Sequence, residues 1–244
     1  MRIGVIGAGV MGSGIAQTAA TAGYDTICTD VSPDALEAAR EAVRSGRFGI
    51  ERGVERGKLS REEADQALAR LRFSDSFTEA ADVDIVIECV PERLDLKVRV
   101  MRELDEVAPP DTILATNTSG FSIAGLAAAT RRPERVIGWH WASPPVVMKF
   151  AEIVTTNETD PSVVERVVEV ARACGKNPIV VKDNPMSWGF VANRVYFAMM
   201  REAERVVAEG VASHEDVNRL MVDCFNWPVG PFAMVKGAGS GWKE

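Results

Sequence analysis

Residues 1–30 read MRIGVIGAGVMGSGIAQTAATAGYDTICTD, in which two apolar runs are separated by closely spaced glycines and small residues. Residues 2–6 predict a buried strand, and residues 10–23 predict a helix that follows it directly. Gly7, Gly9 and Gly12 have the G-x-G-x-x-G spacing at this turn. There, the first glycine permits the tight turn, the second lets the backbone approach a pyrophosphate, and the third allows close helix–strand packing.

The start of the predicted helix is suited to phosphate groups. It offers backbone amides, including those of Val10 and Met11, and the positive end of the helix dipole. Asp30 ends the second apolar run, 18 residues after Gly12. A carboxylate at that place can bind both hydroxyls of an adenosine ribose and would repel a 2′-phosphate. Residues 1–30 therefore predict a dinucleotide-binding domain with NAD as its cofactor.

Strand and helix patterns alternate along the rest of the chain. Apolar runs at residues 24–29, 83–90, 111–116, 135–141 and 177–181 are separated by helical patterns. This alternation is typical of a parallel sheet covered by helices on both faces. We therefore expect an α/β Rossmann domain over residues 1–184, doubly wound with a mainly parallel sheet.

Two segments depart from this alternation. Residues 33–72 contain more helix than a crossover needs and predict a helical hairpin, with Ser60 and Glu63 in a capping box. Residues 185–244 predict a small all-α domain with an apolar stripe. About 60 residues bury little core alone, so this stripe is expected to pack on the first domain or on another chain.

Composition excludes several classes of partner and cofactor. The net charge is −7, from 28 basic and 35 acidic residues, which argues against a nucleic-acid partner. No apolar stretch reaches a membrane-spanning length, and no signal peptide is recognisable. The four cysteines form no C-x-x-C pair, which fits a cytoplasmic protein, and two histidines make a histidine-based metal site hard to build.

His140 is the candidate proton-transfer group because it ends the apolar run 135–141, and sheets of this kind bind ligands at the strand carboxyl ends. If residues 144–147 reverse the chain, Glu152 lies opposite His140 on the paired strand, with Cβ atoms ~5 Å apart. Glu152 interrupts an apolar run, where an unpaired carboxylate would be costly. A His140–Glu152 pair is therefore predicted; the alternative is a structural histidine and a partly exposed glutamate.

Six stretches resemble the 3-hydroxyacyl-CoA dehydrogenase family, which includes 3-hydroxybutyryl-CoA dehydrogenases. They are GVIGAGVMGSGIAQ, DIVIECVPERLDLKVRV, ATNTSGFSI, VIGWHWASPPVVMKFAEIV, GFVANRVYFAMMREA and WPVGPF, in family order over nearly the whole chain. The resemblance implies an NAD-dependent oxidoreductase of fatty acid β-oxidation that interconverts 3-hydroxyacyl-CoA and 3-oxoacyl-CoA. It also implies a helical second domain that forms a homodimer.

The resemblance further implies roles for individual residues. His140 would be the catalytic base with Glu152 as its partner, and Ser119 and Asn193 would hydrogen-bond the substrate oxygen. The implied cofactor contacts are Glu92, Lys97, Ser119 and Ser143, and the implied contacts to CoA phosphates are Arg52, Arg56 and Lys58. From the residues alone, Ser119 could equally serve turn formation and helix capping.

The chain departs from the family pattern in three places. Ser143 stands where the family often has asparagine, residues 186–188 (MSW) are extra, and the chain ends earlier than typical members. The early end indicates a shortened second domain or a fragment. These departures leave open a non-CoA 3-hydroxy acid as substrate, as in gulonate-type dehydrogenases, or a non-catalytic NAD-binding protein.

Overall fold

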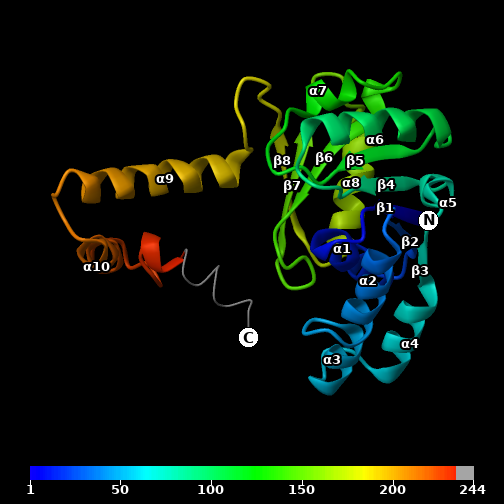
Figure 1. The fold of residues 1–244 in the computed structure, drawn as a ribbon, viewed down its shortest axis with the longest axis horizontal. Helices are drawn as coiled ribbons and strands as arrows, with labels where there is room; N and C mark the ends of the chain where they lie inside the picture. The colour runs from blue at the N-terminus through cyan, green and yellow to red at the C-terminus, as the bar shows by residue number, and fades with distance from the viewer. Residues whose placement is uncertain (235–244) are drawn as a thin grey trace. The chain divides into compact units, whose positions relative to one another are not determined.

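The computed structural model describes residues 1–234, and in them the first compact unit, Met1–Phe190, contains one eight-stranded sheet. Its strand order is β3-β2-β1-β4-β5-β6-β7-β8 (Figure 1). The strands are β1 (Arg2–Ile6), β2 (Asp25–Thr29), β3 (Leu71–Ser74), β4 (Ile85–Glu88), β5 (Ile113–Thr116), β6 (Val136–Trp141), β7 (Phe150–Thr155) and β8 (Asn177–Lys182). Only the β6–β7 pair is antiparallel among these strands, which confirms the mainly parallel Rossmann fold.

Helices cover both faces of this sheet, as continuous apolar strands require. One core lies between the sheet and α1 (Val10–Thr21), α2 (Pro33–Ser45), α4 (Arg61–Arg70) and α8 (Pro161–Ala173). The other lies against α5 (Phe77–Ala81), α6 (Leu94–Val107) and α7 (Ile123–Ala127). A 3-10 turn, η1 (Pro133–Arg135), leads into β6.

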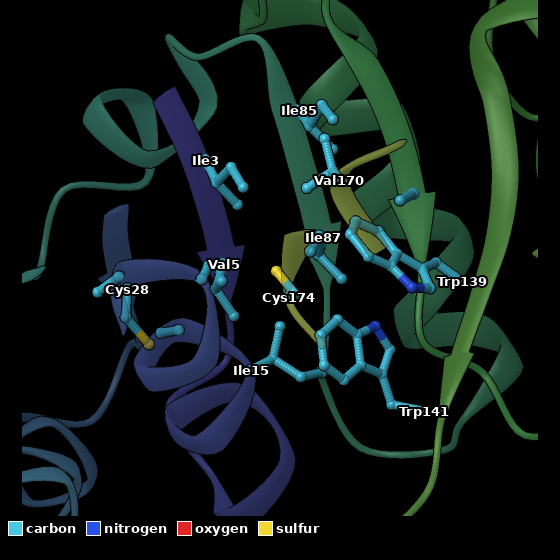
Figure 2. Packing of buried hydrophobic residues seen from close by; sticks show 14 of the residues in the cluster. Ile3, Val5, Ile15, Cys28, Ile85, Ile87, Trp139, Trp141, Val170 and Cys174 are labelled. Carbon is cyan, nitrogen blue, oxygen red and sulfur yellow. The ribbon is translucent and has the colours of Figure 1, made fainter. Parts of the chain in front are cut away.

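The first core places the end of β6 directly beside α1. Trp139 and Trp141 are buried, with ring centroids 5.2 Å apart. Figure 2 shows Trp141 near Ile15 of α1 and Trp139 near Ile87 of β4. Truncating an aromatic side chain of this kind to alanine costs ~3–5 kcal/mol of stability. The helix that follows the glycine turn and the strand that carries His140 therefore share one rigid core.

The excursion differs from the predicted hairpin over residues 33–72. It contains α2, α3 (Ile50–Glu55) and α4, with Gly57 in the left-handed region (φ +65°) between the last two, and the Ser60–Glu63 capping box is present. The prediction of helix up to residue 72 was wrong, because Leu71 begins β3. The free edge of β2 accepts this short strand, with Leu71 paired to Thr26.

The second unit begins at Val191 and contains α9 (Val191–Ala208) and α10 (His214–Phe225). Ser213 and Asp216 form a capping box at the start of α10, and Asn226 ends it in the left-handed conformation. The all-α character of the predicted second domain agrees with these helices, while the domain boundary after residue 184 stays a prediction. None of the helices within residues 1–234 combines the length and apolar character that crossing a bilayer requires.

Candidate functional site

The glycine turn between β1 and α1 has the geometry that a phosphate-binding loop needs. Gly7 lies at φ +104°, a conformation that L side chains rarely adopt, and a Cβ there would come within 2.8 Å of the Cys89 carbonyl oxygen. A Cβ at Gly12 would overlap the Gly7 carbonyl. At Gly9 the surrounding space is open, so a ligand can approach the backbone there.

The surroundings of this turn fit a dinucleotide. The N-terminus of α1 has no side-chain cap and no acidic residue in its first turn, so its amides, with those of Val10 and Met11 among them, stay available to phosphates. Asp30 lies beside the turn: its carboxylate accepts hydrogen bonds from the Ala8 amide (2.8 Å) and the Ser32 amide (2.9 Å). A carboxylate has about four acceptor positions, which leaves capacity for ribose hydroxyls.

His140 and Glu152 lie opposite each other across the antiparallel β6–β7 pair, as the reversal at residues 144–147 predicts. The distance from Nδ1 of His140 to Oε2 of Glu152 is 2.8 Å, and the two residues are 7% and 3% exposed. The rings of Phe150 and Phe190 stand 5.3 and 5.8 Å from the imidazole. A carboxylate at Nδ1 favours the tautomer with its proton there, which leaves Nε2 as an acceptor.

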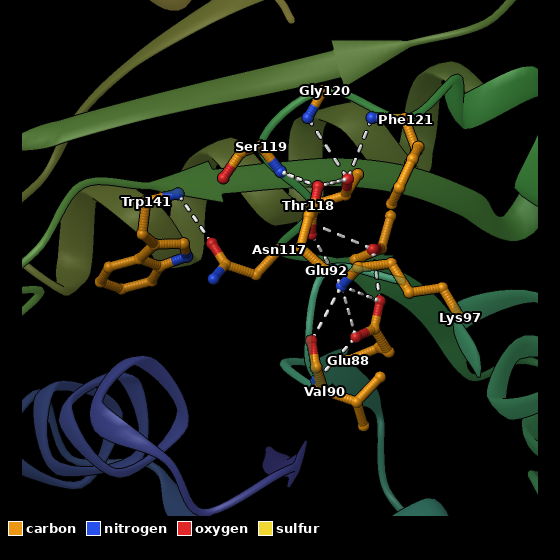
Figure 3. Close-up of polar contacts among 11 residues, drawn as sticks. Glu88, Val90, Glu92, Lys97, Asn117, Thr118, Ser119, Gly120, Phe121 and Trp141 are labelled. Carbon is orange, nitrogen blue, oxygen red and sulfur yellow. Dashed lines mark hydrogen bonds and ion pairs between the residues drawn. The ribbon is translucent and has the colours of Figure 1, made fainter. Parts of the chain in front are cut away.

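A buried ion-pair network lies beneath the carboxyl ends of β4 and β5 (Figure 3). Lys97 is 1% exposed, and its amine binds Glu88 (2.8 Å) and Glu92 (3.3 Å). Glu88 is fully buried and also accepts a hydrogen bond of 2.6 Å from the Thr116 hydroxyl. Buried charges are tolerated when they are paired and hydrogen-bonded in this way.

Glu92 connects this network to Ser119. One Glu92 oxygen accepts hydrogen bonds from the Thr118 hydroxyl (2.5 Å) and the Ser119 amide (2.9 Å). In Figure 3 the Ser119 hydroxyl points away from Glu92. On the same loop, Asn117 accepts a hydrogen bond of 2.9 Å from the Trp141 amide, next to His140. The loop that carries Ser119 is thus tied both to the buried charges and to the end of β6.

Three predicted residues have surroundings that the sequence did not indicate. The Lys97 amine is buried and pairs with Glu88 and Glu92, so in this structure it positions Glu92. Its contact with the cofactor stays a prediction. Ser143 is exposed in the β6–β7 turn, and its cofactor contact also stays a prediction. Asn193 lies in the first turn of α9, in the second unit, so its contact with the substrate oxygen stays a prediction too.

The three basic residues predicted for the CoA phosphates line one cavity of about 430 Å³, together with Arg47. The cavity lies between α1, the excursion, the β6–β7 turn and the end of α8, and none of its lining residues is acidic. Gln17 of α1 holds the excursion through a hydrogen bond of 2.7 Å to the Phe48 carbonyl oxygen. The arrangement is suited to a ligand that carries several negative charges.

Two members of this machinery were missed in the sequence. Glu88 interrupts the apolar run 83–90 just as Glu152 interrupts its own run, and the same reasoning would have selected it. Arg47 lies between α2 and α3, inside the predicted hairpin and in a stretch rich in basic residues, where no local signal separates a ligand contact from a solvated side chain.

Comparison with known proteins gives consistent matches. Residues 2–184 match the family model described as 3-hydroxyacyl-CoA dehydrogenase, NAD binding domain, and residues 189–244 match that of its C-terminal domain. The chain is 40% identical to a probable 3-hydroxybutyryl-CoA dehydrogenase of Bacillus subtilis, over 98% of this chain and 81% of the relative. It is 38% identical to a 3-hydroxyadipyl-CoA dehydrogenase of Escherichia coli, over 95% of this chain and 48% of the relative.

A solved structure agrees with these matches. The crystal structure of (S)-3-hydroxybutyryl-CoA dehydrogenase from Ralstonia eutropha has a TM-score of 0.90 and 37% sequence identity. The similarity covers 96% of this chain and 80% of that structure.

Proposed function

Because this chain belongs to the 3-hydroxyacyl-CoA dehydrogenase family, we propose that its NAD-dependent reaction runs through proton transfer by the His140–Glu152 pair. NAD, when bound, supplies the acceptor for the hydride that leaves C3 of the 3-hydroxyacyl group. The observation that carries the proposal is the buried 2.8 Å contact between imidazole and carboxylate at the carboxyl end of β6. This is the edge where such sheets bind their ligands.

The substrate loses the proton of its 3-hydroxyl group and the hydride of C3 together, to two different acceptors. Nε2 of His140 accepts the proton of the 3-hydroxyl group, and the imidazole becomes positively charged. Glu152 stabilises that charge at 2.8 Å, and the imidazole is buried, with the rings of Phe150 and Phe190 beside it. A positioned base of this kind contributes about 10²–10⁴-fold to the rate. In the reverse direction His140 returns the proton to the oxygen.

Ser119 and Asn193 hydrogen-bond the substrate oxygen in this proposal. The position of Ser119 supports its role. Its backbone amide donates a hydrogen bond of 2.9 Å to Glu92, which fixes the backbone, and its hydroxyl points away from Glu92. The Gly7–Gly12 turn with Asp30 binds the pyrophosphate and adenosine ribose, and Glu92, Lys97 and Ser143 belong to the cofactor side. Besides the base, these residues contribute orientation, because oxygen, base and hydride acceptor must align.

The substrate class is an acyl-CoA in this proposal. The basic cavity supports it, since Arg52, Arg56 and Lys58 line it with Arg47 and its lining contains no acidic residue. Arg52 is also paired with Glu55 at 2.7 Å. A free 3-hydroxy acid carries no phosphate that would use these cations. Acyl-CoA oxidation places the enzyme in fatty acid β-oxidation.

We also propose that the protein is a cytoplasmic homodimer. Within the second unit, large apolar side chains of α9 and α10 are more than half exposed, Val195 at 66% and Leu220 at 61%. Such a face is suited to a second copy of the chain. All four cysteines are free thiols, which suits a reducing compartment.

The test is a substrate panel with the purified chain and NAD, read by NADH absorbance. We expect rapid reduction of NAD with 3-hydroxybutyryl-CoA and at least ~100-fold lower kcat/KM with free 3-hydroxybutyrate, because the CoA binding energy is missing. Equal activity with the free acid would favour a non-CoA hydroxy acid instead. NAD binding without turnover on any substrate would indicate a non-catalytic protein.

A further inference from the structure

A lysine is buried immediately after α8. The helix ends at Ala173, Gly175 follows in the left-handed region (φ +72°), and the Lys176 amide donates 2.9 Å back to the Ala171 carbonyl. This C-terminal cap fixes the Lys176 backbone. The residue is 6% exposed, although lysine is almost never buried without partners.

The contacts of this amine all lead to residues 141–148. Nζ donates hydrogen bonds to the carbonyl oxygens of Pro145 and Met148, the latter at 2.8 Å, and lies 5.0 Å from the centroid of the Trp141 ring. Burial lowers the pKa of the Lys176 amine. Burying this amine costs desolvation free energy, and its hydrogen bonds to the β6–β7 turn offset part of that cost.

The same turn is packed from the other side by α1. A Cβ at Gly14 would come within 2.6 Å of Pro145 Cγ, so the turn lies directly on the helix that follows the glycine turn. Val146 and Val147, between the two carbonyls that Lys176 binds, line the basic cavity. One face of the turn therefore belongs to that cavity, while its two ends continue into the strands of His140 and Glu152.

We propose that Lys176 is a positioning residue that sets the β6–β7 turn, and through it both the cavity wall and the alignment of His140 with Glu152. The inference rests on the proposed function, because the alignment of His140 with Glu152 matters only if this pair transfers the proton. A hairpin keeps its register through its turn, and this turn has no regular two-residue form. Lys176 links the turn's carbonyl groups to the end of α8. The same turn therefore forms part of the cavity and connects the strands of His140 and Glu152.

The experiment compares Lys176→Met with the wild type, using 3-hydroxybutyryl-CoA and the N-acetylcysteamine thioester, which lacks the CoA phosphates. We expect kcat per folded molecule to fall at least ~10-fold with both thioesters. With substrate deuterated at C3, the isotope effect on kcat should rise, because misalignment slows the chemical step. A purely structural lysine would lower the melting temperature and leave kcat and the isotope effect unchanged.

Two controls separate the explanations. Lys182→Met removes an exposed lysine at the last residue of β8, the strand that directly follows Lys176, and should leave kcat unchanged. If Lys176→Met does not fold, Lys176→Leu, which likewise removes the donor, carries the same test. A kcat within twofold of the wild type in either variant would overturn the proposal, as would failure of both to fold while Lys182→Met folds. An inactive wild type would instead refute the proposed function.

Discussion

Replacing Glu152 by glutamine tests the proposed His140–Glu152 pair with the smallest change in shape. The amide oxygen of glutamine can still accept the hydrogen bond from Nδ1 of His140, so ring orientation and tautomer are retained while the negative charge is lost. The pair is buried, with 2.8 Å between the bonded atoms. Taking the charge centres as ~4 Å apart at an effective dielectric constant of about 20, the lost attraction to imidazolium is about 4 kcal/mol.

That energy acts mainly on the transition state, where the imidazole becomes charged. Relaxation and water entry reduce it, so we expect kcat to fall about 10²–10³-fold. The KM for NAD should change little, since the glycine turn and Asp30 are untouched. The assay is NADH formation from 3-hydroxybutyryl-CoA at saturating NAD, with circular dichroism as the check on folding.

A matched control is Glu165→Gln, which removes an exposed glutamate from α8 and should leave kcat within twofold. Turnover of Glu152→Gln within threefold of the wild type would refute the reasoning. His140 would then not build up positive charge during the reaction, or Glu152 would not be its partner. Loss of NADH binding in parallel with activity would also count against it, because it would mean general disruption of the sheet edge.

Further predictions concern cofactor, substrate and stability. Asp30→Ala should weaken NAD binding at least ~10-fold by calorimetry with an unchanged circular dichroism spectrum, since two ribose hydrogen bonds are lost; unchanged affinity would place the ribose elsewhere. Arg56→Met should raise KM for the CoA ester about fivefold to tenfold, as loss of one exposed phosphate contact implies, and leave the N-acetylcysteamine thioester unaffected; equal effects on both would contradict phosphate binding. Burial alone would raise the pKa of Asp105, but hydrogen bonds from Arg131 and Arg132 outweigh it and hold the pKa below its ordinary value. This carboxylate therefore adds stability above its unfolded pKa of ~3.9, which is lost as the pH falls through the lower folded value. Asp105→Asn should cost ~1.5–2 kcal/mol in urea unfolding at neutral pH, as loss of hydrogen bonds to a charged group implies, and flatten the acid dependence; an unchanged slope would show that other carboxylates control it.

The amino-acid sequence was sufficient for the features that depend on local spacing. The glycine turn with Asp30 follows from a strand, a turn and a helix in direct succession. The pairing of His140 with Glu152 follows from a two-residue strand period and a reversal midway between them, and the structure has that register. The capping box of Ser60 and Glu63, which are three residues apart, was predicted for the same reason.

Features that depend on elements far apart in the chain came from the three-dimensional structure. The edge strand β3 forms because β2 offers it free hydrogen-bonding groups, and nothing within residues 71–74 requires it. Glu92 meets Ser119 across 27 residues, and Lys176 meets Pro145 across 31. These contacts arise where separate crossovers end at one edge of the sheet, and a one-dimensional pattern carries no information on how such ends are packed together.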